Sequence, residues 1–159
     1  MPRDFAPFRS VCVFCPGVLG GTGLESAVLT AAAAGAAAPD RIIAIDALAA
    51  RETGRLCRSV QITDAGIVPG AGVGNARSAL NAQTLGVPVV AVGVPTVVDA
   101  RTLCAGLTGA APPPEAEPLF VTPRDIDVRV RESARLVAFA VNMALHDGLT
   151  LEDMESFLG

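Results

Sequence analysis

Short apolar runs alternate with helix-like segments along the chain. The runs are "VCVFC" at 11–15, "RIIAI" at 41–45, "SVQIT" at 59–63, "PVVAVG" at 88–93 and "LFVT" at 119–122. They are largely apolar throughout, without strict alternation, which is typical of strands covered on both faces by helices. The pattern therefore predicts an α/β fold with a mostly parallel sheet flanked by helices.

Three helix starts carry a capping pattern, in which a Thr hydroxyl accepts from an orphan amide and an acidic side chain three residues later reaches back. The pairs are Thr22 with Glu25, Thr122 with Asp125, and Thr150 with Asp153. The middle pair encloses Pro123, a residue favoured at the first helical position. Helical spacing then links Ile126, Val130, Ala134, Val137, Val141 and Leu145 up to Gly148. We therefore expect a long C-terminal helix.

The length of 159 residues fits one domain, so we expect a single domain over residues 1–159. The Pro-rich stretch "GLTGAAPPPEAEP", residues 106–118, predicts a surface connection. No apolar run approaches the roughly 20 residues that cross a bilayer. No secretory pattern opens the chain either, and we expect a cytoplasmic protein with no membrane contact.

Charge and aromatic content exclude one class of partner. The net charge is −4, and the chain has six Phe but no Tyr or Trp. A surface that binds nucleic acid needs positive charge against phosphates and aromatic rings against bases. We therefore expect no direct binding of nucleic acid.

Four cysteines raise the question of metal or redox chemistry. Cys12 and Cys15 have the spacing of a thiol-disulfide motif, but in a strand a separation of three residues sends the side chains to opposite faces. No second CxxC completes a zinc site. Together with Cys57 and Cys104, these residues are predicted to be buried free thiols, and no cofactor or metal is expected.

Asp46 stands out because it follows the apolar run "IIAI" directly. In an open parallel sheet, ligands and catalytic groups gather beyond the carboxyl ends of the strands, and both Asp46 and Thr96 are expected at such ends. An Asp at that position can also cap a following helix, here "ALAARE". Position alone does not distinguish a catalytic carboxylate from a helix cap.

A glycine-rich segment, "TDAGIVPGAGVGN" at residues 63–75, is a second candidate for function. Its spacing matches neither a dinucleotide motif nor a P-loop, so we expect it to shape a cleft beside Asp46 in which an extended peptide lies. The predicted substrate cleft contains Asp64, Gly70, Gly72, Gly74, Asn75, Thr96 and Asp99. Two structural alternatives stay open: Asp64 in a turn, and Thr96 with Asp99 as a helix capping box.

The single histidine, His146, falls in the last turn of the predicted C-terminal helix. An imidazolium is favourable there because it faces the negative end of the helix dipole. A Ser-His-Asp or Cys-His centre would depend on this one residue, and we expect none.

Several segments together resemble the germination protease family. They are "IIAIDALAAR", "QITDAGIVPGAGVGN", "TLGVPVVAVGVPTVVDA", "LFVTPRDID" and "NMALHDG", in the family's order and spacing from about Phe8 onward. The resemblance implies an endopeptidase that degrades small acid-soluble spore proteins during germination, in the spore core. It also implies a fold like that of the hydrogenase-maturation endopeptidases, a homotetramer made as a zymogen, and two catalytic aspartates, one of which matches Asp46.

The resemblance covers only the C-terminal portion of the family's proteins. The family's amino-terminal part carries the propeptide, the opening strand and helix units and the other catalytic aspartate. Upstream of Asp46 the chain offers Asp4, Glu25 and Asp40, and none has a matching context. Because peptide hydrolysis by carboxylates normally needs two groups in different protonation states, we expect this chain alone to be weakly active or inactive.

Two alternatives belong to other functional classes. One is a noncatalytic peptide-binding or assembly module that keeps the glycine-lined groove. The other is a metal-dependent relative of the hydrogenase-maturation endopeptidases with Asp46 as a ligand, although one His and no second placed carboxylate are few ligands for a closed site.

Overall fold

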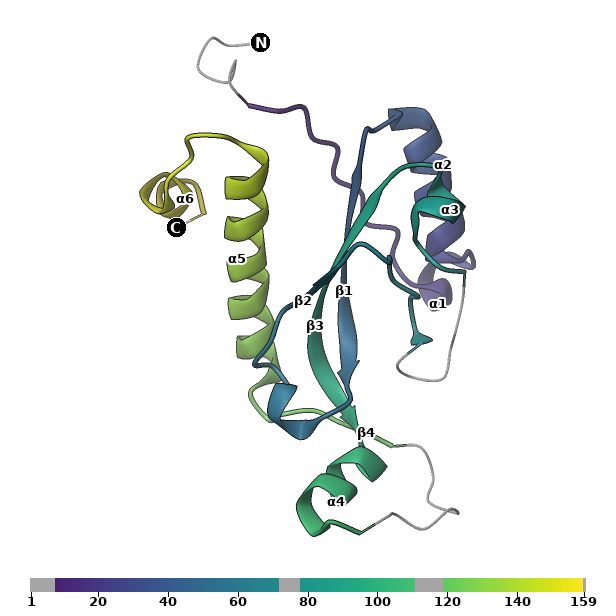
Figure 1. Ribbon diagram of the computed structural model, residues 1–159, viewed down its shortest axis with the longest axis vertical. Coiled ribbons are helices and arrows are strands. Elements are labelled where there is room, and N and C mark those ends of the chain that lie inside the picture. The colour runs from purple at the N-terminus through teal and green to yellow at the C-terminus, as the bar shows by residue number, and fades with distance from the viewer. Residues whose placement is uncertain (1–7, 72–77, 111–118, 159) are drawn as a thin grey trace. The chain divides into compact units, whose positions relative to one another are not determined.

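The computed structural model describes residues 8–71, 78–110 and 119–158 (Figure 1). The elements are α1 Leu19–Thr22, α2 Ser26–Ala37, β1 Ile42–Ala50, the 3-10 helix η2 Thr53–Arg55, β2 Gln61–Thr63, α3 Ala82–Leu85, β3 Val89–Asp99, α4 Ala100–Thr108, β4 Phe120–Val121, α5 Ile126–Leu145 and α6 Leu151–Leu158. None of the helices in these ranges combines the length and the apolar character that a membrane span requires.

The chain divides into two compact units. The larger one, Phe14–Ile126, contains the sheet, and the other joins the segment up to Val13 with the residues from Asp127 onward. Most of the predicted Pro-rich connection, residues 111–118, lies outside the described residues. The single-domain assignment therefore stays a prediction.

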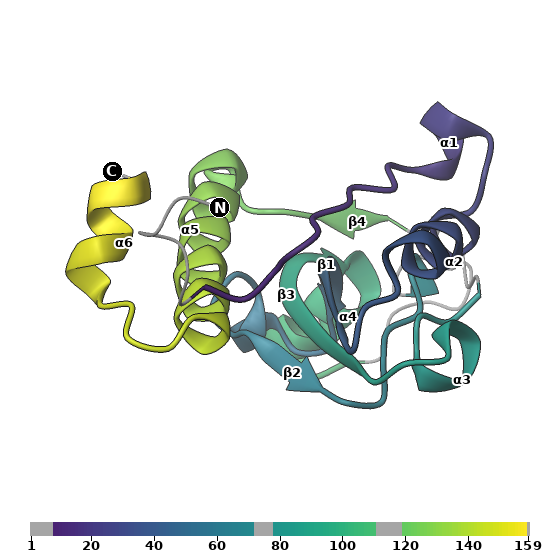
Figure 2. The ribbon, with the colours of Figure 1, turned by 90° about the horizontal axis from the view of Figure 1, so that it is seen from above.

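The sheet of the larger unit is mixed, so the prediction of a mostly parallel sheet is wrong. β3 lies between β1 and β2 and is parallel to β1, whereas β2 and β4 are both antiparallel to β3 (Figure 2). β2 is only three residues long and runs opposite to β3 after the connection of residues 51–60, which includes η2; it lies on the other side of β3 from β1.

The register gives the two faces of the sheet different chemistry, because paired residues on neighbouring strands share a face. One face is wholly apolar and carries Ile43, Ile45 and Ala47 of β1, Val90, Val92 and Val94 of β3 and Ile62 of β2. The other face carries small and apolar residues together with three polar ones, Asp46, Gln61 and Thr63. Before the register shift, that is up to Pro95 of β3, the polar side chains of these three strands therefore lie on a single face.

The register between β1 and β3 shifts near the C-terminal end of β1. Leu48 pairs with Pro95 and Ala49 pairs with Val97, so Thr96 is the extra residue of a bulge. Two contacts hold this region from outside the pair: the Cys57 N–H donates to the Pro95 carbonyl at 2.7 Å, and the Thr122 hydroxyl donates to the Thr96 carbonyl at 2.9 Å. Pro95 and Val98 beside the bulge are fully buried.

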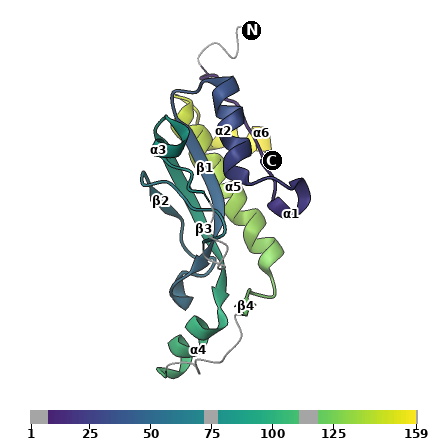
Figure 3. The same ribbon diagram turned by 90° about the vertical axis from the view of Figure 1, so that its right-hand side faces the viewer.

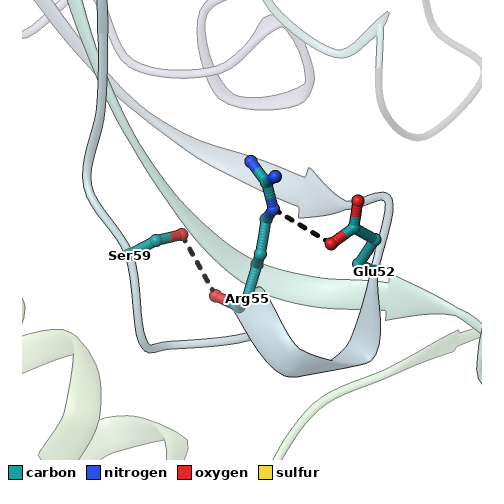
Figure 4. Close-up of polar contacts among 3 residues, drawn as sticks. All are labelled: Glu52, Arg55 and Ser59. Atoms are coloured by element: carbon teal, nitrogen blue, oxygen red, sulfur yellow. Dashed lines mark hydrogen bonds and ion pairs between the residues drawn. The ribbon is translucent and has the colours of Figure 1, made fainter.

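The chain leaves β1 through a short turn with local polar contacts. The Arg55 Nε lies 3.2 Å from the Glu52 Oε2, and the Ser59 hydroxyl donates to the Arg55 carbonyl at 3.4 Å (Figure 4). All three side chains lie near the surface, so this ion pair contributes little to stability. Its effect is to shape the return of the chain from β1 to β2.

Helices α2 and α3 lie on one side of the sheet within the larger unit (Figure 3). α2 has no charged residue in its twelve positions, and only Ala27 among them is buried. Its N-cap is Glu25, whose side chain makes no capping bond and instead accepts from the Ser78 hydroxyl at 3.1 Å. The predicted Thr22–Glu25 capping box is therefore wrong, and Thr22 is the last residue of α1.

The other unit contains the long helix that the sequence predicts. α5 begins at Ile126, three residues after Pro123, and ends at Leu145, three residues before Gly148, which has a φ of +89°. The predicted Thr150–Asp153 capping box is confirmed, because the Asp153 carboxylate accepts from the Thr150 N–H at 2.8 Å and the Asp153 N–H donates to the Thr150 hydroxyl at 3.2 Å. Val130 and Ala134 are exposed, so the buried stripe of α5 is narrower than predicted.

Two predictions for the N-terminal region are wrong. Residues 11–15 belong to no strand, and the run "VCVFC" is an exposed segment without regular structure. Cys12, Cys15 and Cys104 are exposed and Cys57 is half-buried, so the prediction of buried thiols is wrong. An apolar run becomes a strand only where another strand offers its hydrogen bonds, and no described strand lies beside this one.

Candidate functional site

Asp46 lies in the middle of β1 and not at its end. β1 continues through Ala47 to Ala50, so the predicted position at a strand end is wrong, and no helix follows directly for Asp46 to cap. It pairs with Gly93 on β3, which in turn pairs with Gln61 on β2. Asp46, Gly93 and Gln61 therefore form one row across the sheet on its mixed face.

β1 is an edge strand: β3 lies on one side of it, and no other described strand lies on its outer side. The Ile42 N–H donates to the Pro88 carbonyl at 3.0 Å, so the main-chain groups of Ile42 point toward β3. By alternation, those of Ile45 and Ala47 point to the open edge. Ile45, Asp46 and Ala47 are all exposed although they face opposite sides of the sheet, which shows that the middle of β1 is uncovered.

The carboxylate of Asp46 turns toward this open edge. Its Oδ1 accepts from the Ala47 N–H at 2.8 Å and so satisfies an edge donor that has no strand partner in the described part of the chain. Loss of hydration raises the pKa of Asp46, and the bond from the Ala47 N–H offsets part of that effect. The result is a carboxyl group that holds its proton more readily than an ordinary Asp.

Gly93 lets a neighbouring side chain fill the middle of the row. A β-carbon on Gly93 would collide with the side chain of Leu48, which lies two residues beyond Asp46 on the same face. Leu48 therefore packs onto the bare backbone of Gly93 and makes the surface between Asp46 and Gln61 apolar. Sequence reasoning missed Gly93, Leu48 and Gln61, although a Gly inside the run "VVAVGVP" is a known sign of close approach by a neighbour.

The glycine-rich segment is only partly described. Asp64 is exposed in a bend directly after β2, where the Ala65 N–H donates to the Thr63 hydroxyl at 3.1 Å. This places it in a turn, three positions along the chain from Gln61. Gly70 adopts a φ of +75° in the following turn, and Gly72, Gly74 and Asn75 lie outside the described residues.

The start of that segment is held in place by a crowded glycine. Gly66 has a φ of +84°, and a β-carbon there would collide with the Leu80 carbonyl and with Asn81. The next residue, Ile67, exchanges backbone hydrogen bonds with Leu80 at 3.0 and 2.7 Å. The close approach at Gly66 therefore fixes the start of the glycine-rich segment against Leu80 and Asn81.

Thr96 and Asp99 occupy structural positions. Thr96 is the bulge residue of β3 and does not begin a helix, so the predicted Thr96–Asp99 capping box is wrong. Asp99 is itself the N-cap of α4 and accepts from the Arg101 N–H at 2.8 Å and the Thr102 N–H at 3.3 Å. Its carboxylate serves the helix start, six residues along β3 from Gly93, which lies in the row of Asp46.

His146 has a different environment from the one its sequence position predicts. It follows α5 directly and is buried; its Nδ1 accepts from the Arg9 N–H at 3.2 Å, and its ring lies 4.9 Å from that of Phe8. The ring thus contacts the N-terminal segment, and the residue lies just beyond the helix and not in its last turn. His146 ties the N-terminal segment to the end of α5.

Within the described ranges, no three His, Cys, Asp or Glu side chains come together in a way that could hold a metal ion. The geometry defines an α/β protein with one exposed carboxyl group of raised pKa, set at the middle of an open strand edge. Such a carboxyl group can exchange protons with a ligand at that edge. This arrangement suits acid–base chemistry on a polypeptide more than metal or nucleotide binding.

Comparison with known proteins gives the family. The model of the germination protease family matches residues 5–108, which include β1 with Asp46, the glycine-rich segment and β3. The chain is 38% identical to the germination protease of Clostridium tetani over 94% of this chain and 57% of that protein. It is 35% identical to that of Caldanaerobacter subterraneus over 98% of this chain and 60% of that protein. The chain belongs to the germination protease family.

A shorter match has a higher sequence identity. Against the germination protease of Bacillus subtilis, the chain is 52% identical over 98 residues, which make up 62% of this chain and 27% of that protein. The chain thus spans little more than half the length of the curated relatives that it matches along most of its own sequence.

Proposed function

We propose that Asp46 is one of two catalytic aspartates of an endopeptidase that degrades small acid-soluble spore proteins during spore germination. Membership of the germination protease family supports the reaction class. The observation that carries the role of Asp46 is its position, in the middle of an open strand edge with its carboxylate turned outward. A second carboxylate that approaches this edge would meet Asp46 directly.

The raised pKa of Asp46 suggests how the two groups divide the reaction. One carboxylate takes a proton from water as the water oxygen adds to the peptide carbonyl carbon. Asp46, in its protonated form, gives its proton to the amide nitrogen as the carbon–nitrogen bond breaks. Two carboxyl groups that lie close together share one proton because like charges disfavour double ionisation.

The second carboxylate is not assigned to any residue of this chain. Glu25 is engaged with Ser78, Asp99 caps α4, and Asp64 lies beyond the end of β2. We propose that the partner comes from polypeptide corresponding to the part of the curated relatives that this chain does not span. The same proposal includes the family's hydrogenase-maturation-endopeptidase-like arrangement, zymogen synthesis, homotetramer and location in the spore core.

Cleavage of a purified small acid-soluble spore protein tests the proposal. The parent chain and the Asp46→Asn variant are each incubated with the substrate, and the products are followed by mass spectrometry. We expect slow or no cleavage by the parent and none by the variant. Equal, robust cleavage by both chains would remove Asp46 from the mechanism.

A noncatalytic peptide-binding module is the second candidate. The open edge of β1 favours it, because outward main-chain groups can pair with an extended segment whether or not a second carboxylate is present. This function predicts binding of the uncleaved substrate that is equally tight in the Asp46→Asn variant. The cleavage experiment and a binding titration on the same two proteins separate the two functions.

A further inference from the structure

Gln61 is the polar residue of β2 that shares a row with Asp46. Both side chains lie on the mixed face of the sheet, on opposite sides of Gly93. Neighbouring strands are about 4.8 Å apart, so the Cα atoms of Asp46 and Gln61 are separated by about 10 Å. Both side chains stand on the same face of the sheet, so an extended polypeptide that lies across the row can contact both.

The carboxamide of Gln61 is available to a ligand. Its side chain is exposed, and it makes no hydrogen bond with another residue of the described ranges. Its neighbour on the same face, Thr63, already accepts from the Ala65 N–H and lies one row away, opposite Ala91 and Ala44. Among the described residues in the row of Asp46, Gln61 is thus the one polar side chain that makes no hydrogen bond within the protein.

We infer that Gln61 binds the main chain of the substrate beside Asp46; this inference rests on the proposed endopeptidase function. A carboxamide has both an N–H donor and a carbonyl acceptor, as a peptide group has, so it forms a complementary pair of hydrogen bonds with one peptide unit of an extended polypeptide. It recognises the backbone and is indifferent to the side chains. Because a carboxamide does not titrate, this contact stays constant while Asp46 changes its protonation state.

The apolar surface between the two residues supports the same role. Leu48 covers Gly93, so a peptide group held between Asp46 and Gln61 rests on a hydrocarbon side chain. Hydrogen bonds that form over an apolar surface are less exposed to competition from water. The substrate class that this row fits is an extended polypeptide segment held by its backbone.

A binding titration in the Asp46→Asn background tests Gln61 independently of catalysis. The ligand is a fluorescently labelled small acid-soluble spore protein, and the readout is its anisotropy. Gln61→Leu removes both hydrogen bonds at similar volume and is expected to weaken binding about tenfold. The matched control is Gln83→Leu in α3, which changes an exposed glutamine of another element and is expected to leave the affinity unchanged.

A second measurement places Gln61 next to Asp46 without any ligand. Gln61→Glu adds a like charge to the row and is expected to raise the pKa of Asp46, measured by carboxyl NMR titration, by about half a unit. Gln83→Glu is the control and is expected to cause no such change. An unmoved Asp46 titration in Gln61→Glu overturns the inference.

Either of two binding results also overturns it: equal affinities for Gln61→Leu and Gln83→Leu, or no binding by the Asp46→Asn parent. These outcomes are distinct from failure of the proposed function, which is decided by whether cleavage depends on Asp46. A protein that cleaves through Asp46 but binds equally well without the Gln61 carboxamide would retain the function and exclude this contact.

Discussion

The side chain of Leu48 occupies the space above Gly93 that a β-carbon would need. The Cδ1 and Cγ atoms of Leu48 would overlap that β-carbon and Cδ2 would lie 3.1 Å from it, so no rotation of a terminal methyl alone relieves the conflict. Gly93 is therefore part of the packing of β1 against β3, immediately beside Asp46. This pair of residues is the first point at which the arrangement can be tested.

Gly93→Ala is expected to destabilise the protein by about 1–3 kcal/mol, because the added methyl displaces Leu48 from a packed position. Urea unfolding followed by circular dichroism measures the change. The matched control is Gly35→Ala in α2, where a β-carbon meets nothing within 4 Å and a helix-favouring residue is expected to stabilise by about 0.5–1 kcal/mol.

The double variant Leu48→Ala with Gly93→Ala isolates the contact. Its loss of unfolding free energy is expected to be smaller than the sum of the losses in the two single variants, because Ala at position 48 leaves room for the methyl group at position 93. Strict additivity of the two costs would show that Leu48 and Gly93 are independent.

Asp46→Asn is expected to change how stability depends on pH. The folded state raises the pKa of Asp46, so the protein gains from the protonated form, and that gain is present below the ordinary Asp value of about 3.9. It is lost as pH rises through the ordinary value and then through the raised one. The variant, which cannot ionise, is therefore expected to be slightly more stable than the parent at neutral pH and indistinguishable from it near pH 3.

Thermal unfolding of both proteins from pH 3 to pH 8 measures this difference. The effect is small because the exposed carboxylate keeps part of its hydration. A parent that becomes more stable relative to the variant as pH rises would contradict the expected sign, and would show that the Ala47 N–H bond outweighs the loss of hydration.

Gly66→Ala is expected to be among the most destabilising glycine substitutions in the larger unit. Its φ of +84° is strained for an L side chain, and the β-carbon would collide with the Leu80 carbonyl. We expect a loss of more than about 2 kcal/mol, measured by urea unfolding. Gly109→Ala is the control, because it has a φ of +69° but open space around it, and is expected to cost only about 1 kcal/mol. Equal costs would show that the close approach at Gly66 relaxes freely.

The Thr150–Asp153 capping box is expected to make α6 sensitive to acid. Hydrogen bonds from the Thr150 hydroxyl and N–H hold the pKa of Asp153 below its ordinary value. The stabilisation is therefore present above the ordinary value of about 3.9 and is lost as pH falls through it and then through the lowered pKa. The protection of the α6 amides, relative to the intrinsic exchange rate at each pH, is expected to fall over this interval in the parent.

Asp153→Ala is expected to show fast exchange in α6 at every pH, with no acid transition, because it lacks the carboxylate. Asp153→Asn keeps an acceptor oxygen and is the matched control. Its α6 amides are expected to have an intermediate protection that does not vary over the same interval. Retention of the acid transition in Asp153→Ala would assign it to another group.

The sequence predicts the elements that are strongly apolar and misses those that depend on distant partners. "RIIAI" and "PVVAVG" are confirmed as strands, and "SVQIT" and "LFVT" as shorter ones, because runs of branched apolar residues favour strands in any sheet. "VCVFC" has the same composition, yet it is no strand, because strand formation also requires a neighbour. The direction of β2 likewise depends on its turn, which composition does not reveal.

Asp46 shows the same limit for the site. The end of an apolar run is taken as the end of a strand, but Ala47, Leu48, Ala49 and Ala50 continue β1, because alanines next to a long β3 are held by its hydrogen bonds. Sequence reasoning thus finds the residue and misplaces it. The row of Asp46, Gly93 and Gln61 emerges only from the register between strands 15 to 47 residues apart in the chain.

His146 gives the molecule a built-in reporter. The chain has one histidine, and its Nδ1 accepts from the main-chain N–H of Arg9 while the N-terminal segment is attached. A single pair of ring nitrogen resonances in an NMR spectrum therefore distinguishes the attached from the detached state without any label on the segment. Each preparation, variant or complex of this protein carries its own readout of whether residues 8 and 9 are in place.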